Sequence, residues 1–368
     1  MTSASSEERL RRRRLRSQRL SGSPAASPDD VVGHLLAVQA QDGRGFRLAV
    51  RSRSRRLTVR DVDAALNEGR MLVTWLNRGT LHLVRSEDYR WLHRLTAHRV
   101  LPGVQTRLRT LGVTMGDEER GVVIVVDALE DDGPLTRLQL RDRLDHAGIT
   151  TGGQALVHVL TAASLRGLVV RGPLVDGQHA FVSTERWLGP EPVATDRDDD
   201  LHRLARRYLV GHGPATPADL AYWTGITLGD ARRAVDTLAD EVREVDGGVM
   251  LAASPTTSSA QPRVRLLGAF DPLLHGWSSR TPFLGVHRSV VTTNGIFRAS
   301  CLVGGRAVGT WTLPATGPVI ELLEEVDDEG RDALVADAAD VTRFLGHGGG
   351  PATFRTGSRP GPPPSAPG

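Results

Sequence analysis

The sequence contains no lysine, so all 46 of its Lys and Arg positions are arginine. A lysine-dependent lyase step needs a Schiff-base amine, and the phosphate-binding loop Gly-x-x-x-x-Gly-Lys-Ser/Thr needs a lysine as well. The chain itself supplies neither. Its glycine-rich run Gly304–Thr310 reads as a hairpin rather than as a phosphate loop.

Cysteine is nearly absent as well, with Cys301 alone. One thiol forms neither an internal disulfide nor a thiolate metal cluster, which fits a reducing compartment. His93 and His98 are five residues apart, too far round a helix to share a metal comfortably. No Gly-x-Ser-x-Gly nucleophile elbow is present either. We therefore expect neither a metal nor an organic cofactor.

Aromatic residues make up only 4% of the chain, a poor fit to a protein that stacks on many single-stranded bases. No run approaches the roughly 20 apolar residues of a membrane span. The basic segment Arg9–Arg16 is followed by the polar run Ser21–Asp30, where a signal peptide would need an apolar core. These features predict a cytoplasmic protein without a membrane partner.

Arginine is abundant, and Lys+Arg total 46 against 43 for Asp+Glu, a formal net charge of +3. The guanidinium group is always charged and its planar fork suits phosphate. A codon bias toward Arg, Ala, Gly and Val also accounts for this composition, so charge by itself does not decide the function.

A pattern of helix, turn, helix and two-stranded ribbon occurs three times. In the second and third blocks the elements Pro-x-Thr-x-x-x-Leu (from Pro134 and Pro214) and Gly-Ile-Thr (from Gly148 and Gly225) recur. This order is the winged helix-turn-helix plan, whose second helix commonly enters the DNA major groove. After residue 262 short strand-like runs with Asn-Gly and Gly-Gly turns suggest a small barrel or sandwich.

We therefore predict an α+β chain of tandem winged helix-turn-helix modules followed by a small C-terminal β barrel. The expected boundaries are a basic arm at 1–20, a first winged helix with the catalytic motif at 29–115, a second at 116–190, a third at 200–253, the barrel at 263–345 and a disordered tail at 346–368. The arm is expected either to be solvated or to lie on DNA phosphate. Residues 191–200 and 254–262 read as linkers.

The triplet Gln39-Ala40-Gln41 carries two carboxamides just before Gly43 and Gly45. A carboxamide accepts and donates hydrogen bonds at once, which is enough to hold a water. Residues i and i+2 share a face of an extended segment but not of a helix. If both amides serve one site, the segment cannot be regular helix through Gln41. Otherwise the two glutamines are ordinary polar residues at a helix end.

Four stretches of the sequence resemble the winged-helix DNA glycosylases of the AlkZ type, over roughly residues 8–345: Val38–Asp42, Thr74–Val84, Leu267–Trp277 with Arg280, and Gly305–Trp311. The first is similar to the family's catalytic Gln-apolar-Gln motif, and this resemblance implies that Gln39 and Gln41 are catalytic. It also implies bulky N7- or N3-alkylated purines as substrates, interstrand crosslinks in some members, and excision without full base flipping.

The chemistry is consistent with that resemblance. A purine alkylated at N7 is cationic and already a good leaving group. An enzyme that removes it must place a water under the anomeric carbon and tolerate an oxocarbenium-like transition state. A glutamine carbonyl oxygen orients such a water and partly stabilises positive charge. Two neutral amides therefore suit a labile lesion and not an intact nucleoside.

Arginines close to the triplet are candidate phosphate contacts around the lesion, although a solvated face is equally plausible: Arg44, Arg47 and Arg51. Arg78 lies at a predicted hairpin tip and is a candidate wing contact.

His275, Trp277 and Arg280 lie in one stretch, and they either probe the minor groove or lesion or form a packed loop. Asp271 is expected to hold a turn.

The sequence thus predicts a monofunctional, monomeric DNA glycosylase that acts on alkylated double-stranded DNA at the nucleoid. The alternative is a non-catalytic winged-helix DNA-binding protein such as a transcriptional regulator, which would dimerise and bind a specific sequence.

Overall fold

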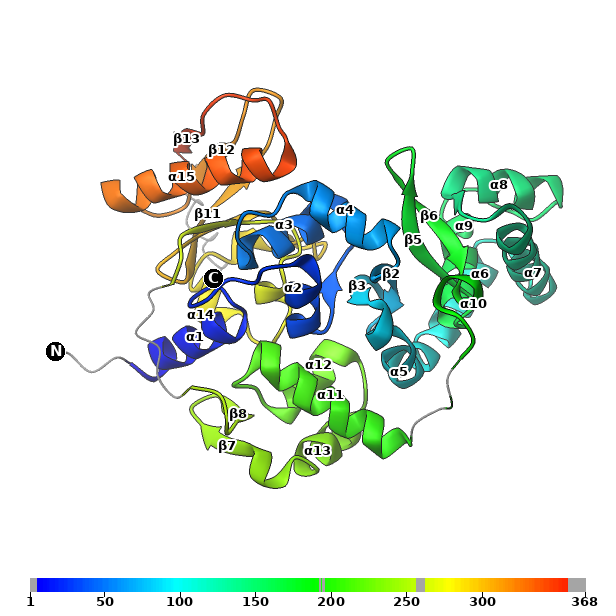
Figure 1. Cartoon of the computed structure of the whole chain (residues 1–368), viewed down its shortest axis with the longest axis horizontal. Helices are drawn as coiled ribbons and strands as arrows, with labels where there is room; N and C mark the ends of the chain where they lie inside the picture. The colour runs from blue at the N-terminus through cyan, green and yellow to red at the C-terminus, as the bar shows by residue number, and fades with distance from the viewer. Residues whose placement is uncertain (1–4, 192, 194–195, 256–261, 357–368) are drawn as a thin grey trace, which may run out of the picture.

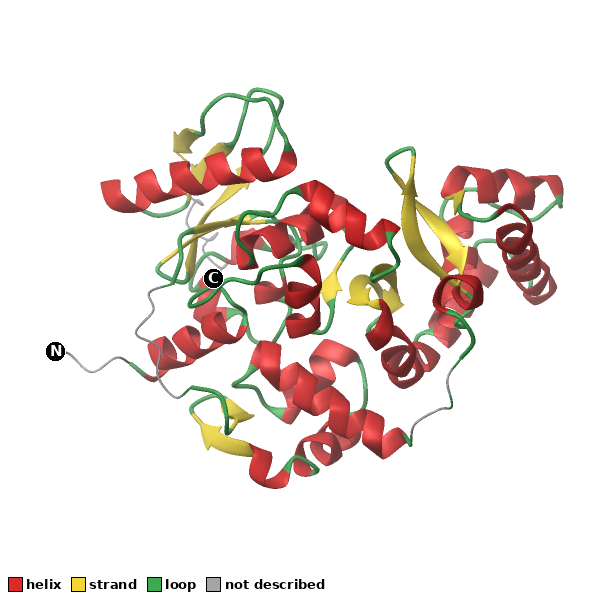
Figure 2. Cartoon of the chain, in the orientation of Figure 1, coloured by secondary structure: helices red, strands yellow, loops and turns green. Residues whose placement is uncertain are grey.

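The computed structural model describes residues 5–191, 193, 196–255 and 262–356. Residues 1–4 of the predicted arm, 192, 194–195 and 256–261 of the predicted linkers, and 357–368 of the predicted tail lie outside the described residues. Helices and strands both occur throughout the described chain, which confirms the α+β class (Figure 1, Figure 2).

The N-terminal region is part of the folded body. Ser6–Ser17 forms helix α1. Leu15 and Leu20 are fully buried, and the Arg14 Nε donates a hydrogen bond to the Pro214 carbonyl at 3.1 Å. The expectation of a free arm is therefore wrong for this helix, because its leucines are covered by the rest of the protein.

Three segments of the chain share the order of three helices followed by a two-stranded ribbon, and the first two also have a short strand after their first helix. The first segment consists of α2 (Pro28–Leu35), β1 (Val38–Gln39), α3 (Gly43–Arg53), α4 (Val59–Asn67), β2 (Met71–Leu76) and β3 (Thr80–Arg85). The second consists of α7 (Met115–Asp132), β4 (Leu135–Thr136), α8 (Arg137–His146), α9 (Ala155–Leu165), β5 (Val169–Val175) and β6 (Gln178–Ser183). The third consists of α11 (Arg197–His212), α12 (Pro217–Thr224), α13 (Leu228–Asp236), β7 (Val242–Val245) and β8 (Gly248–Leu251). Helices α5 (Ser86–Thr96) and α6 (Leu101–Thr110) link the first segment to the second, and α10 (Thr184–Leu188) follows the second.

The repeated Pro-x-Thr signature marks the start of a helix. In α8 the Gln139 Oε1 accepts from the Thr136 N–H at 2.8 Å, and in α12 the Asp219 Oδ2 accepts from the Thr216 N–H at 3.0 Å. Each threonine side chain caps the helix in return. This reciprocal capping box satisfies two backbone donors that a helix N-terminus otherwise leaves unpaired.

The first two segments share one six-stranded sheet of order β1-β3-β2-β5-β6-β4. The two ribbons meet where Val73 of β2 pairs with Arg171 of β5. The predicted boundary between residues 115 and 116 therefore does not separate two independent sheets. Strand β1, which carries Gln39, lies at one edge of this sheet.

Helix α9 occupies the position that a winged helix commonly places in the major groove. Its residues 159–165 are all buried, and it packs against α6, α7 and β2. This helix cannot enter a DNA groove without leaving the core.

The C-terminal region is an open sheet covered by a helix. Its elements are β9 (Arg265–Leu267), α14 (Thr281–Leu284), β10 (Ser300–Val303), β11 (Arg306–Thr312), β12 (Val319–Leu322), α15 (Asp328–Leu345) and β13 (Thr353–Thr356). The strand order is β13-β12-β11-β10-β9, and within the described residues the two edge strands do not pair to close a barrel.

The barrel prediction is therefore wrong. The buried face of α15, with Leu334, Ala338, Val341 and Phe344, packs beside the sheet and covers apolar surface that barrel closure would otherwise bury. The predicted disordered tail is wrong as far as residue 356, since β13 pairs in parallel with β12.

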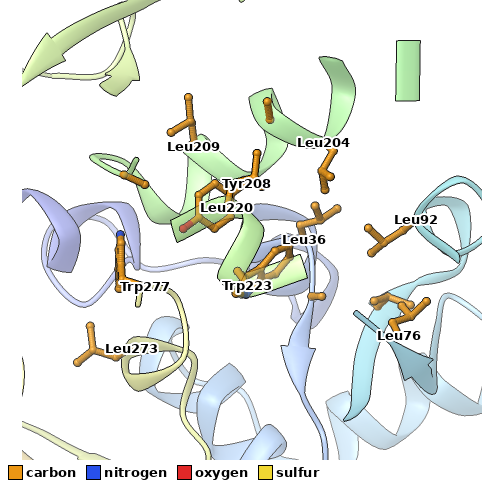
Figure 3. Close-up of a cluster of buried hydrophobic side chains, with 14 of the residues drawn as sticks. Leu36, Leu76, Leu92, Leu204, Tyr208, Leu209, Leu220, Trp223, Leu273 and Trp277 are labelled. Atoms are coloured by element: carbon orange, nitrogen blue, oxygen red, sulfur yellow. The ribbon is translucent and has the colours of Figure 1, made fainter. Parts of the chain in front are cut away.

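One cluster of buried side chains connects the first segment, the third segment and the C-terminal region (Figure 3). Its members include Leu36, Leu76, Leu204, Tyr208, Trp223, Leu273 and Trp277. Because these regions share a core, the C-terminal region holds a fixed position beside the triplet.

Candidate active site

The triplet lies in extended backbone. Helix α2 ends where Leu36 adopts a positive φ of 69°. In β1, Gln39 pairs with His82 of β3, and the Ala40 N–H donates to the Leu81 carbonyl at 2.7 Å. The prediction that the segment is not regular helix through Gln41 is confirmed.

Extended backbone brings the two carboxamides together. The Gln39 Nε2 donates to the Gln41 Oε1 at 2.5 Å. Gln39 is 6% exposed, whereas Gln41 is exposed, so the pair joins the interior to the surface. The Gln39 Oε1 is buried and has no hydrogen-bond partner among the described residues, which leaves an acceptor free.

More buried polar atoms without a partner lie on β2 and in the turn that follows it. The register places Thr74 and Gln39 opposite His82, on the same face of the sheet. The Thr74 Oγ1 and both side-chain polar atoms of Asn77 are buried without a partner in the described part of the chain. Burial lowers the pKa of His82 to about 4, so its imidazole is neutral near pH 7. The face behind Gln39 is thus polar and uncharged.

Helix α3 begins directly after the triplet. The Asp42 side chain caps it by accepting from the Gly45 N–H at 2.5 Å. A Cβ at Gly45 would lie 2.2 Å from the Ala269 carbonyl oxygen, so only glycine allows this approach. The segment that precedes His275 is therefore held against the first turn of α3.

A buried ion pair fixes that contact at the far end of α3. The Arg53 Nη2 and Nη1 donate to the two carboxylate oxygens of Asp271 at 2.8 and 2.9 Å, and both side chains are fully buried. The Asp271 Oδ1 also accepts from the Leu273 N–H at 2.9 Å. The prediction that Asp271 holds a turn is confirmed.

Of the three arginines near the triplet, Arg44 is the exposed one. It lies on the first turn of α3. The Arg47 side chain is only 12% exposed, with its Nη2 2.6 Å from the Asp63 carboxylate and its guanidinium carbon 4.6 Å from the Phe46 ring centre. No carboxylate of the described residues forms an ion pair with Arg44, whereas Asp63 compensates the charge of Arg47.

Arg51 points the other way. It is 3% exposed, contacts Asp337 through Nη2, and donates from Nε to Asp340 at 2.9 Å. These contacts tie α3 to α15. Arg51 is not available to phosphate, and we withdraw it from the candidate DNA-binding residues.

Arg78 and Arg280 both contact Tyr222 of α12. The Arg78 guanidinium carbon is 4.6 Å from the centre of the Tyr222 ring, and the Arg280 Nη2 donates to the Tyr222 Oη at 2.5 Å. Neither arginine forms an ion pair with a carboxylate of the described residues.

His275 and Trp277 are interior residues. Trp277 is 1% exposed, and its Nε1 donates to the His212 carbonyl at 2.9 Å (Figure 3). The His275 ring centre is 3.8 Å from that of Phe297, and burial with the nearby charges of Arg78 and Arg280 lowers the pKa of His275 well below 6.5. Both side chains are buried, so we no longer regard them as DNA contacts. They belong to a packed loop, which was the alternative expected from the sequence.

Sequence reasoning missed His82, Thr74 and Tyr222. The alternation of Thr80-Leu81-His82-Leu83 indicated that His82 and Leu81 face opposite sides. The pairing of β1 with β3, which brings His82 to Gln39, had no signal in the sequence because the two strands are about 40 residues apart.

The described residues contain no group of three or more His, Cys, Asp or Glu side chains that could hold a metal ion. Within the same ranges no helix is long and apolar enough to span a bilayer.

Known proteins resemble the chain over nearly its whole length. It is 26% identical over 368 residues to the Streptomyces sahachiroi protein named interstrand DNA cross-link repair glycosylase, a match that spans 90% of this chain and 95% of that protein. The solved structure of Streptomyces sahachiroi DNA glycosylase AlkZ superposes with a TM-score of 0.78 at 25% identity, covering 96% of this chain and 100% of that one.

A shorter match, 32% identical over 122 residues, is to tRNA-specific 2-thiouridylase MnmA of Rhodococcus opacus (strain B4) and covers only 32% of this chain and 31% of that protein. The model of the family described as DNA glycosylase AlkZ-like matches residues 32–344, which include the paired glutamines. The chain therefore belongs to the DNA glycosylase AlkZ-like family.

Proposed function

We propose that this protein hydrolyses the N-glycosidic bond of N7- or N3-alkylated purines in double-stranded DNA, with a water oriented by Gln39 and Gln41. The observation that carries the proposal is the pair of hydrogen-bonded carboxamides at the sheet edge, one buried and one exposed. The unpartnered Gln39 Oε1 is the acceptor that would orient the water.

The reaction is a displacement at C1′ of the damaged nucleotide. The water oxygen forms a bond to C1′, and the C1′–N9 glycosidic bond breaks. Its electrons leave with the purine and neutralise the positive charge that alkylation at N7 or N3 created. The water loses one proton to solvent. Glutamine carbonyl oxygens stabilise the partial positive charge on the sugar while it develops, and no strong base is required for so labile a bond.

Substrate selection follows from that lability. Two amides do not activate water enough to cleave an intact nucleoside, so we expect only cationic, already weakened purines to be released. The relative's name concerns interstrand crosslinks. We propose that bulky N7 adducts and such crosslinks are substrates as well, because the exposed position of Gln41 does not require the base to enter a deep pocket.

Arg44, Arg78 and Arg280 are the proposed phosphate contacts around the lesion, and Arg47 is a weaker candidate because Asp63 neutralises it. We also propose that the three repeated segments are winged helices that have been adapted to hold this site. Burial of α9 speaks against the alternative of a regulator that reads DNA through each second helix. Action as a monomer at the nucleoid stays a prediction.

The test is single-turnover release from duplex DNA that carries one N7-methylguanine or one bulky N7-alkylguanine, read as abasic sites. We expect Gln39→Ala and Gln41→Ala to slow release by roughly a hundredfold. Gln154→Ala is the matched control because Gln154 is exposed at the start of α9, and its rate should equal that of the parent.

No release of either lesion by the parent would overturn the proposed activity. Release that survives both site substitutions would overturn the assignment of the two glutamines instead.

A further inference from the structure

Three arginines from different parts of the chain meet around Tyr222 and the C-terminal end of α12. Arg280 follows the buried 271–277 stretch, Arg78 is at the turn between β2 and β3, and Arg99 lies between α5 and α6. The Arg99 Nε donates to the Gly225 carbonyl at 3.0 Å, directly after α12. A helix C-terminus carries partial negative charge, which favours cations at this point.

Tyr222 holds two of these arginines with different parts of its side chain. Its hydroxyl accepts from the Arg280 Nη2 at 2.5 Å, and its ring lies 4.6 Å from the Arg78 guanidinium carbon. Arg280 is held further by its Nε hydrogen bond to the Leu274 carbonyl at 2.9 Å and by the Phe297 ring, 5.0 Å away. A guanidinium that is already oriented loses less entropy when it binds a ligand.

The turn that carries Arg78 is itself fixed. A Cβ at Gly225 would lie 3.3 Å from the Arg78 Cγ and 3.6 Å from the Asn77 carbonyl oxygen. A Cβ at Gly79 would lie only 2.7 Å from the Val100 Cγ1. Close packing on both sides fixes the position of this turn, so it is not a mobile wing of a winged helix.

The cluster is positively charged and uncompensated. No carboxylate of the described residues forms an ion pair with Arg78, Arg99 or Arg280, although many other arginines of the chain have such partners. Uncompensated cations that are held close together repel one another, and an anion between them relieves this repulsion. Arg78 and Arg99 are exposed, so the cluster faces an external ligand.

The cluster lies beside the candidate active site. Arg78 and Arg280 are both close enough to lower the pKa of His275, and Arg78 also lowers that of His82, the strand partner of Gln39. The turn that carries Arg78 leads directly into β3, and His82 of that strand pairs with Gln39, so the backbone itself connects the cluster to the paired glutamines.

We propose that Tyr222 is a positioning residue that sets Arg78 and Arg280, and that these two arginines and Arg99, which the Gly225 carbonyl holds, form a clamp for DNA phosphates next to Gln39 and Gln41. The third segment then meets DNA through the C-terminal end of α12 and not through α13, the helix that a winged helix commonly inserts. The identity of the ligand as DNA rests on the proposed function.

Helix α13 provides the matched comparison. Arg232 is exposed on α13 and has no ion pair with the described residues, so it is the arginine that groove insertion of α13 would use. Its neighbour Arg233 contacts Asp230 at 3.0 Å, which neutralises it. Arg99→Gln and Arg232→Gln each remove one exposed charge, one from the proposed clamp and one from the alternative surface.

The experiment measures the affinity of the full-length protein for an undamaged duplex at a series of salt concentrations. Each lost phosphate contact lowers the slope of log K against log[salt] by about 0.9. We expect this decrease for Arg78→Gln, Arg99→Gln and Arg280→Gln, and the parental slope for Arg232→Gln. Parental slopes in all three clamp variants, or a lowered slope in Arg232→Gln alone, would overturn the proposal.

Tyr222 is tested by two substitutions. Tyr222→Phe keeps the ring under Arg78 and loses the hydroxyl that binds Arg280, whereas Tyr222→Leu loses both. We expect a weak decrease in affinity for the first and a decrease of roughly three- to tenfold for the second, with a slope below that of the parent. Equal, parental affinities for the two variants would contradict the positioning role. Tyr222→Phe keeps the test valid if the leucine variant fails to fold.

Binding to undamaged DNA requires no excision, so the two proposals fail separately. In a Gln39→Ala background the salt slope should be that of the parent. If the clamp variants keep the parental salt slope and the parent protein excises lesions, only the clamp proposal is overturned. If the clamp variants show lowered slopes but the parent protein releases no lesion, only the proposed activity is overturned.

Discussion

Arginine side chains of the same chemistry take opposite roles in this protein, and burial decides which. Arg53 is fully buried and forms two hydrogen bonds with Asp271, and Arg51 is buried against Asp337 and Asp340. Arg44 is exposed two residues after the Asp42 cap. A guanidinium keeps its charge in each of these places. The buried Arg51 and Arg53 therefore pair with carboxylates, whereas the exposed Arg44 can use its charge to bind a ligand.

The contrast between Arg51 and Arg44 gives a direct test. Arg51→Ala leaves the Asp337 carboxylate buried with a weaker set of partners, and we expect the free energy of unfolding in urea to fall by about 3–5 kcal/mol. Arg44→Ala should leave that free energy within about 0.5 kcal/mol of the parent and weaken DNA binding. If Arg51→Ala kept the stability of the parent and weakened DNA binding, the assignment of Arg51 to the core would be contradicted.

At the scale of elements, the start of α3 is where three parts of the chain meet. Strand β1 ends at Gln39, α3 begins at Gly43, and the backbone at Gly268 and Ala269 lies against Gly45. The two glycines of this helix start serve different purposes. A Cβ at Gly43 would meet only the Arg47 Nη1, at 3.7 Å, whereas one at Gly45 would meet backbone at 2.2 Å.

These two glycines are therefore a matched pair. Gly45→Ala must push the 268–269 backbone away from α3, and we expect it to cost about 1–3 kcal/mol of stability and to slow lesion release by moving the triplet. Gly43→Ala adds the same methyl group in ordinary contact and should be neutral or stabilise by about 0.4–1 kcal/mol. Thermal or urea unfolding of both variants, with single-turnover release, checks this. Equal behaviour of the pair would show that the close approach does not matter.

Helix α9 shows how tertiary packing changes the use of a repeated element. Its sequence reads as the second helix of a helix-turn-helix unit, yet α6 and α7 cover it. The linking helix α6, together with α7 of the same segment, thus buries a possible DNA-reading helix. This is why we propose that DNA contacts the sheet edge and α12 instead.

At the scale of the whole molecule, several histidines are buried without charge. Burial lowers the pKa of His82 to about 4 and that of His212 to about 3, and these side chains are 4% and 0% exposed. His212 stacks on Tyr208 with ring centres 4.7 Å apart, at the centre of the shared core. Protonation of either ring would bury a charge that forms no ion pair with a carboxylate of the described residues.

Stability should therefore fall in mild acid. In the unfolded chain a histidine has a pKa of about 6.5, so between pH 6.5 and 4 the unfolded state binds more protons than the folded state, and the free energy of unfolding decreases as pH falls. We expect a loss of about 2 kcal/mol per fully buried histidine between pH 7.5 and 5, measured by urea unfolding. His212→Phe, which keeps a ring on Tyr208, should lose part of this dependence. Constant stability down to pH 5 would contradict the burial of these rings in neutral form.

Local signals predicted local structure well. Thr136 and Thr216 start helices as capping boxes, and the β2–β3 hairpin joins at Asn77-Arg78-Gly79. The roles of Arg51 and Trp277 were not predictable, because each depends on contacts with residues far away in the sequence, such as Asp337 and His212. The prediction of a C-terminal barrel was wrong for the same reason. Short strands were expected, but closure depends on the partners of the edge strands.

The sequence by itself determined the α+β class, the three repeated segments and the absence of lysine. It required a non-helical conformation of Gln39 and Gln41 only on the condition that both amides serve one site. These follow from residue type, spacing and local hydrogen bonding. Only the tertiary structure decided which arginines lack a carboxylate partner among the described residues, that α9 is core, that His82 pairs with Gln39, and that Tyr222 contacts Arg78 and Arg280. Burial and ion pairing depend on segments that are distant in sequence and become neighbours only when their apolar faces pack together.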